Sequence, residues 1–392
     1  MSRWIILTLC VLSVVFVYTV PTVMLPVLFA EMAAELDLDI VQLGVAWGSI
    51  ALSSMIVGLF GGALGDRFGS KLTLGIICLL MGIFGILRGF APNYPILIVT
   101  FMLFGLVSPS LPPNLHKAAA YHFPNNRGIS TVIISLGFAF ALFISSRYTA
   151  TVISPLVGGW RQVLFWFGGF GLVFGLIWLL LVPNGTLPPP AKGNQPFFSG
   201  IFASLKKVLA IREMWIIGIA STLFWACFRG FTGYTPLYLR NLGWTAVEAD
   251  NTLSTFFLAS LILALPATLI SERLGSRKPF LAGSMVLIGG GVLALGFVGG
   301  GLILVAVFVA GLMFDGYMAL HQAEVLDLKD IGPFAGTALG SLVMFREAGG
   351  VFGPPIGNWL VQFGPTTPFI FWGGLGLMAA VILLFLGTKK EA

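Results

Sequence analysis

Three arginines, Arg147, Arg229 and Arg346, stand inside long apolar runs of this chain. An ionisable side chain inside a bilayer is costly, so each of them is expected to have a function. A guanidinium group stays charged and donates two parallel hydrogen bonds to an oxyanion. These residues therefore predict a binding site for a small anion, with Tyr18 and Tyr148 as polar-tipped neighbours. The alternative is that each arginine is held in a structural ion pair.

Two acids in similar apolar surroundings, Asp315 and Glu347, are candidates for proton coupling. The proton affinity of a carboxylate depends on burial and on nearby arginines, so a change in access can load and unload a proton. Glu347 follows Arg346 directly and is expected to point about 100° away from it on a helix, where it would not neutralise its neighbour. The alternative for both acids is a fixed salt bridge, for instance to Arg229 or Arg346.

Residues for other chemistries are missing from the sequence. The three cysteines, Cys10, Cys78 and Cys227, lie in apolar runs and form no spaced pair, so neither disulfides nor a metal cluster is expected. His321 and Glu324 are too few for a metal site and are interpreted as a gating contact. No nucleophile–base set or phosphate loop is visible. We expect no cofactor, no metal and no enzymatic activity.

The composition requires a membrane. Of 392 residues, 57% are hydrophobic and only 9% are charged, whereas about a quarter are charged in an average soluble domain. A membrane helix needs about 20 apolar residues. Segments of this kind are predicted at 4–30, 40–65, 71–90, 95–118, 128–157, 161–182, 213–239, 249–271, 279–298, 301–322, 334–358 and 367–387.

The charges in the loops predict the orientation. With the N-terminus inside, most of the 21 Lys and Arg residues fall on the cytoplasmic side, as the positive-inside rule requires. The outer loops instead carry acids such as Glu31, Glu35 and Glu248. Both termini are therefore expected in the cytoplasm. The basic residues lack the clustering of a nucleic-acid surface. Arg88 lies near the outer end of its segment and is expected to extend its charge towards the membrane surface.

A polar loop occurs twice. Gly65-Asp66-Arg67-Phe68-Gly69-Ser70-Lys71 is followed 206 residues later by Ser271-Glu272-Arg273-Leu274-Gly275-Ser276-Arg277. The pairing places Asp66 on Glu272 and Arg67 on Arg273. Proline motifs agree, because Ser154-Pro155 of the fifth segment aligns with Gly353-Pro354 of the eleventh, which also aligns Arg147 with Arg346. The repeat indicates an internal duplication.

The first copy resembles the signature loop between the second and third helices of the major facilitator superfamily, G-x-L-a-D-R-x-G-r-k, with Ser70 in place of one basic residue. Tyr121-His122-Phe123-Pro124, followed by Arg127-Gly128, resembles a loop of organic-anion porters in that superfamily. The resemblance implies an all-α polytopic protein of twelve transmembrane helices in two pseudo-symmetric six-helix bundles. We expect bundles at 1–182 and 213–392, joined by a cytoplasmic linker at 183–212 that contains an interfacial helix.

The resemblance also implies a function: secondary transport by alternating access, in the inner or plasma membrane, by a monomer. The predicted substrate is a small organic or inorganic anion, coupled to protons. The cytoplasmic gate is expected to consist of Asp66, Arg67, Lys71, Glu272, Arg273 and Arg277. Two alternatives remain open. One is an efflux antiporter for amphipathic compounds, which the Pro155 motif favours, and the other is a membrane scaffold or sensor without transport.

Overall fold

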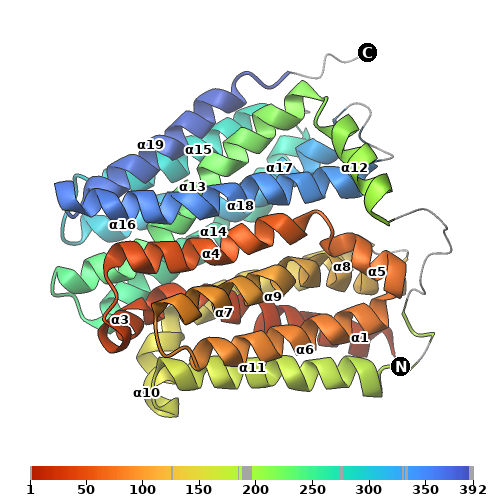
Figure 1. The fold of residues 1–392 in the computed structure, drawn as a ribbon. Coiled ribbons are helices and arrows are strands. Elements are labelled where there is room, and N and C mark those ends of the chain that lie inside the picture. The colour runs from red at the N-terminus through yellow and green to blue at the C-terminus, as the bar shows by residue number, and fades with distance from the viewer. Residues whose placement is uncertain are drawn as a thin grey trace. The chain divides into compact units, whose positions relative to one another are not determined.

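A computed structural model describes residues 2–124, 127–183, 185–187, 197–273, 277–328, 331 and 334–387. These residues form helices and turns, and no strand occurs among them. Contacts divide the chain into two compact units. Unit 1 contains Met1–Asp39 and Ser49–Asn194, and unit 2 contains Ile40–Gly48 and Gln195–Ala392. Figure 1 shows the helices of both units.

In unit 1 the first membrane segment is interrupted. It consists of α1 (Arg3–Ser13), the π-helix η1 (Val14–Thr19), α2 (Val20–Val23) and α3 (Leu25–Leu36). The remaining elements follow in order: α4 (Ile40–Gly58, shared with unit 2), α5 (Gly61–Phe68), α6 (Ser70–Gly89), α7 (Tyr94–Val107), η2 (Ser108–Ser110), α8 (Leu111–His122), α9 (Arg127–Tyr148), η3 (Thr149–Ile153), α10 (Ser154–Val157), α11 (Trp160–Leu176) and η4 (Ile177–Leu181).

The larger part of unit 2, Gln195–Ala392, begins with the short helix α12 (Phe197–Val208), which lies within the predicted linker. The elements that follow α12 are, on average, longer than α12 itself. They are α13 (Arg212–Asn241), α14 (Ala246–Arg273), α15 (Lys278–Ala294), α16 (Leu302–Gly311), α17 (Phe314–Leu326), α18 (Ala335–Trp359), η6 (Leu360–Phe363) and α19 (Thr367–Leu383). Prolines inside α13, α14 and α18 are accommodated in continuous helices, because neighbouring helices and side chains can satisfy the freed carbonyls.

The predicted fold class is confirmed. Every predicted membrane segment corresponds to a helix or to consecutive helices, with ends that differ by a few residues. Among the described residues, eight segments are long and apolar enough to cross a membrane, and α15 and α19 are shorter apolar helices. The chain is therefore an all-α polytopic membrane protein. The bundle boundaries at 182 and 213 stay a prediction.

Glycines allow the closest helix pairs within each unit. In unit 1, α6 and α11 lie side by side (Figure 1), and a Cβ added to Gly171 would lie 2.6 Å from the Cα of Gly82. In unit 2, a Cβ at Gly353 would lie 2.5 Å from the Cα of Ala226, where α18 crosses α13. Small residues replace the hydrophobic effect as the basis of packing in lipid, because they let backbones approach closely.

Candidate functional site

Two arginines of unit 2 share one buried carboxylate. Glu347 Oε2 accepts a hydrogen bond from Arg229 Nη2 at 3.2 Å, and Glu347 Oε1 accepts from Arg346 Nη2 at 2.8 Å and Nε at 3.1 Å. The side chains of Glu347 and Arg229 are only 4% and 7% exposed, and that of Arg346 is 19% exposed. The three side chains, called here the arginine–glutamate triad, carry one net positive charge because two guanidinium groups face one carboxylate.

The close approach of α13 and α18 assembles this triad. The hydroxyl of Thr222 in α13 donates to the carbonyl of Phe345 in α18 at 2.8 Å, one residue before Arg346. One helical turn along α18, a Cβ on Gly349 would overlap the carbonyl oxygen of Thr222, so only glycine allows this spacing. Arg229 lies seven residues beyond Thr222, two turns along α13, and therefore on the same face of that helix.

The triad corrects one expectation. Arg346 was expected to be unable to neutralise Glu347, because adjacent residues point about 100° apart on a helix. The structure contradicts this, since both Nε and Nη2 of Arg346 reach the same carboxylate oxygen. The flexible side chain of arginine folds back along α18, which an argument from Cβ directions does not consider. The ion pair expected as an alternative is therefore present for Arg229, Arg346 and Glu347.

Two tryptophans cover the guanidinium groups of the triad. The Cζ of Arg346 lies 4.7 Å from the ring centroid of Trp225, and that of Arg229 lies 5.2 Å from the ring of Trp47. An aromatic face attracts a cation without competing for its hydrogen bonds, and the attraction is about 2 kcal/mol when water is excluded. The sequence did not identify Trp47, because nothing distinguishes it from the other tryptophans of an aromatic-rich chain.

Asp315 makes a hydrogen bond that does not involve the triad. Its Oδ2 accepts a hydrogen bond from Ser260 of α14 at 2.5 Å. Asp315 belongs to the first turn of α17, where the positive end of the helix dipole stabilises a carboxylate. Phe314, the preceding residue, stacks on Phe228 at 4.5 Å, so the surroundings are aromatic. Ser260 was missed by the sequence analysis, since a lone serine in an apolar helix gives no signal.

His321, the expected gating residue, is buried in α17. Its ring lies parallel to that of Tyr317, with centroids 4.9 Å apart, and Nδ1 lies 3.0 Å from the Tyr317 carbonyl. Glu324 is 3.9 Å from Arg277, which also donates to Asp327 at 2.5 Å. Among the described residues no group of His, Cys, Asp and Glu side chains is suited to a metal ion. The predicted gate residue Arg277 thus pairs with acids of its own unit.

The other predicted gate residues lie around α5 and at the end of α14. Arg67 is exposed in the last turn of α5, and Lys71 is half-buried in α6. The side chains of Asp66, Glu272 and Arg273 lie outside the described part of the chain. Asn114 of α8 holds α5 by donating to the Gly61 carbonyl at 2.9 Å.

The predicted substrate residues of unit 1 lie beside π-helical turns. Tyr18 is half-buried in η1, with its ring 6.3 Å from that of Phe138 in α9. Arg147 and Tyr148 end α9 immediately before η3, and the Arg147 guanidinium lies 5.6 Å from the Tyr148 ring. Single π-turns inside α-helices occur frequently at functional sites.

The π-turn η3 changes the equivalence of the two repeats. Arg147 precedes Pro155 by eight residues, and Arg346 precedes Pro354 by eight, but only the first interval contains a π-turn. A π-turn accommodates about one residue more than an α-turn. In helical phase, Arg147 therefore corresponds to Glu347, seven residues before Pro354, and not to Arg346 as the sequence alignment predicted.

Arg88 does not extend to the membrane surface. It is fully buried, its Nη1 donates to the carbonyl of Pro21 at 3.1 Å, and its Cζ lies 3.8 Å from the ring centroid of Phe104. The expectation of an exposed guanidinium is therefore wrong. The Pro21 carbonyl, at the interruption of the first segment, and the face of Phe104 hold the guanidinium group of Arg88 inside the protein.

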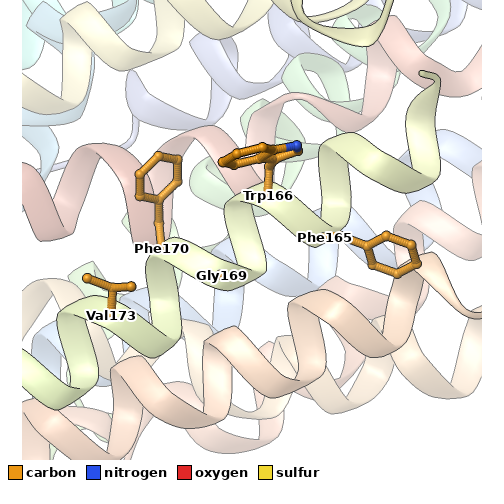
Figure 2. Close-up of a pocket in the computed structure, with 5 residues that line it drawn as sticks. All are labelled: Phe165, Trp166, Gly169, Phe170 and Val173. Carbon is orange, nitrogen blue, oxygen red and sulfur yellow. The ribbon is translucent and has the colours of Figure 1, made fainter. Parts of the chain in front are cut away.

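Grooves occur on the outer faces of unit 1, but they carry little polarity. The groove in Figure 2 has a volume of about 380 Å³ and is lined by Phe165, Trp166, Gly169, Phe170 and Val173 of α11. A second groove of about 320 Å³ lies along α1 and η4. Neither groove presents a charged side chain, so neither is suited to bind an anion.

The chain belongs to the major facilitator superfamily. The family model, described as "Major Facilitator Superfamily", matches residues 7–249 and again residues 239–392. The family consists of transporters, and the expectation that the chain is not an enzyme is thus confirmed. It is a multi-pass integral membrane protein.

Similar proteins include several transporters of organic anions. The chain is 33% identical over 171 residues to a probable galactarate/D-glucarate transporter, GudP, of Escherichia coli strain K12, a stretch that covers 40% of this chain and 36% of GudP. The chain thus spans little more than a third of that relative. It is 23% identical over 384 residues to a probable sulfoacetate transporter, SauU, of Cupriavidus necator, covering 90% of this chain and 86% of SauU. The hexuronate transporter of Bacillus subtilis is 23% identical over 379 residues, covering 89% and 86%.

Solved structures agree with the fold. A nucleoside transporter, NupG, superposes with a TM-score of 0.79 at 13% identity, covering 98% of this chain and 100% of the other. A bacterial homologue of the human lysosomal transporter Spinster superposes with a TM-score of 0.74 at 14% identity, covering 98% and 95%. At such low identity the likeness concerns the fold alone.

Proposed function

We propose that this chain moves a small organic or inorganic anion across the membrane together with protons, by alternating access. The observation that carries the proposal is the arginine–glutamate triad, in which Glu347 occupies both guanidinium groups. A buried pair of cations with one carboxylate between them resembles an anion site that is filled by an internal carboxylate. The relatives described above support the choice of an organic anion, because the substrates in their names are carboxylates or a sulfonate.

Competition between Glu347 and the substrate would couple transport to protons. While Glu347 is ionised, it satisfies Arg229 and Arg346 and leaves them little attraction for a second anion. A proton on Glu347 removes its charge, and both guanidinium groups then offer forked hydrogen bonds to a substrate carboxylate. The substrate and the proton would therefore bind together and be released together. Asp315, with Ser260 as its hydrogen-bond partner, is the second candidate for carrying the proton.

The remaining predicted residues keep their proposed roles. Arg147, Tyr18 and Tyr148 are proposed substrate contacts of unit 1, and the two signature loops are proposed to form the cytoplasmic gate. We further propose a monomer in the inner membrane with both termini in the cytoplasm. The symport of proton and anion follows from the competition at Glu347, and an antiporter would instead release the proton as the substrate binds.

Uptake into proteoliposomes tests the proposal. The panel consists of radiolabelled galactarate, D-glucarate, a hexuronate, sulfoacetate, 4-hydroxybenzoate and nitrate, each with and without an inward proton gradient. Wild type is compared with Arg346→Gln. We expect the gradient to stimulate uptake of one anion, and the substitution to abolish that uptake. Lys206→Gln is the matched control, because it removes an exposed positive charge of α12 without touching the triad.

Two results would contradict the proposal. Uptake of no anion, together with export of lipophilic cations, would favour the efflux antiporter. Anion uptake that is identical in wild type and Arg346→Gln would separate the triad from the substrate site.

A further inference from the structure

Arg88 of α6 is a buried charge that the proposed transport mechanism does not use. Its exposed fraction is 0%, and among the described residues no carboxylate forms an ion pair with it. Its contacts include the Pro21 carbonyl, which accepts from Nη1 at 3.1 Å, and the face of Phe104 of α7, 3.8 Å from Cζ. The ring of Phe101, also in α7, lies further away, 5.9 Å from Cζ. Nε has no hydrogen-bond partner within the described part of the chain. A charge kept under these conditions needs an explanation other than ion pairing.

Pro21 belongs to the interruption of the first membrane segment. The four-residue helix α2 ends at Val23, and α3 starts at Leu25. Met24 lies between them, belongs to neither helix and keeps right-handed backbone angles. Pro26 has no N–H, so the helical donor for the Thr22 carbonyl is also missing. Neighbouring side chains commonly satisfy the carbonyls at such interruptions in membrane helices. Arg88 performs this role at Pro21.

The segment on the other side of the interruption is attached to the same end of α6. Arg161 Nη1 donates to the carbonyls of Gly89 and Ala91 at 2.7 Å each, and its Nε donates to Glu35 of α3 at 2.6 Å. The end of α6 therefore contacts α2 directly through Arg88 and α3 indirectly through Arg161. The two arginines fix the two sides of the interruption independently.

We propose that Arg88 is a positioning residue for the π-turn η1, which precedes α2 without a break and carries Tyr18. By holding the Pro21 carbonyl, Arg88 fixes the end of α2 and with it the place of Tyr18 in the substrate site. The role of Tyr18 rests on the proposed function, whereas the attachment of α2 to α6 does not. Lysine has a single ammonium group without the planar fork of arginine, so Arg88→Lys should replace the function only in part.

Hydrogen–deuterium exchange of the full chain in lipid nanodiscs tests the attachment. In Arg88→Met we expect exchange of the amides of 14–24 to rise on the order of ten-fold, the change that corresponds to about 1.4 kcal/mol of local stability. Exchange in α19 should stay as in wild type. Phe104→Leu retains Arg88 but removes the aromatic face nearest to its guanidinium group. It should therefore raise the exchange of 14–24 less than Arg88→Met does. If Arg88→Met fails to fold, Phe104→Leu provides the test instead. Arg161→Met should leave the exchange of 14–24 unchanged.

Uptake of radiolabelled D-glucarate provides the second readout. Arg88→Met should raise KM while kcat changes little, and Arg88→Lys should restore part of the affinity. Unchanged exchange of 14–24 in Arg88→Met would overturn the proposal, and so would a rise in exchange that is equal throughout the chain of that variant. A rise in the exchange of 14–24 in Arg161→Met that equals the rise in Arg88→Met would also overturn it. A confined rise in exchange combined with an unchanged KM would overturn the link to Tyr18. Absence of D-glucarate uptake in wild type would exclude D-glucarate as the substrate and leave the exchange result to decide the attachment.

Discussion

At the scale of residues, the triad shows how one carboxylate controls two cations. Each oxygen of Glu347 serves a different arginine, so removal of Glu347 and removal of an arginine have unequal consequences. Without one arginine, a neutral pair remains. Without the glutamate, two like charges remain buried, and leaving buried charges uncompensated costs about 3–5 kcal/mol.

Glu347→Gln is therefore expected to lower the unfolding free energy more than Arg346→Gln does. It should also make anion uptake independent of the proton gradient, because a neutral glutamine imitates the protonated acid permanently. Thermal unfolding in detergent and gradient-dependent uptake measure the two effects. Equal melting temperatures for the two variants would contradict the shared-carboxylate description.

A second residue-scale prediction concerns pH. Glu35 lies in α3 beyond the first membrane-spanning segment, and its hydrogen bond from Arg161, with a further one from Trp160, lowers the pKa of its carboxyl. A carboxyl whose pKa is lowered by folding stabilises the protein above its unfolded pKa of about 4.3, and this contribution disappears as pH falls through the folded pKa.

Glu35→Gln should consequently destabilise the protein at pH 7 and lose this effect progressively below about pH 4. The Glu35 side chain is 49% exposed, so screening limits the effect to less than about 1 kcal/mol. Melting temperatures of wild type and variant across this range, at low and high salt, provide the measurement. A difference that grows as pH falls would reverse the predicted sign.

At the scale of elements, glycine spacing determines which helices approach closely. Gly171 of α11 faces α6, where a Cβ would meet the Gly82 Cα at 2.6 Å, while a Cβ on Gly169 of the same helix would have nothing within 4 Å. Both positions lie on α11, only two residues apart, but Gly171 is in close contact with α6 and Gly169 is not. They form a matched pair for a test of overpacking.

Gly171→Leu should destabilise the protein by roughly 1–3 kcal/mol, because the added side chain forces α6 and α11 apart. Gly169→Leu should have little effect, since its side chain would enter the open groove of Figure 2. Unfolding of both variants in the same detergent compares them. Similar losses at both positions would show that helix propensity or lipid contact, and not the spacing of α6 and α11, determines the result.

The helices themselves were predictable from the sequence, and their irregularities were not. Apolar length placed segments such as 71–90 within a residue or so of α6, because the bilayer imposes that length. The π-turn η3 left no pattern in the sequence, since Thr149–Ile153 is as apolar as its neighbours. Likewise, the burial of Arg88 depends on Phe104 and the Pro21 carbonyl, which are distant in the chain. Tertiary partners of this kind decide the direction of a side chain.

At the scale of the whole molecule, the basic residues distinguish the two sides of the membrane. Lys206 and Lys207 in α12 and Arg277 before α15 belong to the side predicted to be cytoplasmic, and Glu248 at the start of α14 belongs to the other. The hydrogen bonds that Glu248 accepts from the N–H and hydroxyl of Thr245 lower the pKa of its carboxyl, so it is ionised at the start of that helix. The orientation is therefore open to a direct test.

In right-side-out vesicles, a membrane-impermeant maleimide should label Val247→Cys and leave Lys206→Cys unlabelled until the membrane is permeabilised. Both side chains are exposed, and the native Cys10, Cys78 and Cys227 are buried, so the background should be low. The reverse pattern would place the termini outside and reverse the predicted direction of every loop.

The π-turn η3 holds about one residue more between Arg147 and Pro155 than a continuous α-helix of the same length would hold. Removal of a single residue from Thr149–Ile153 should therefore convert the π-turn into an α-turn without rotating Arg147 relative to Pro155. If the same residues instead formed a regular α-helix with none removed, Arg147 would be rotated by about 100°. The π-turn thus acts as a spacer that sets the direction of a charged side chain without any change in its distance along the sequence.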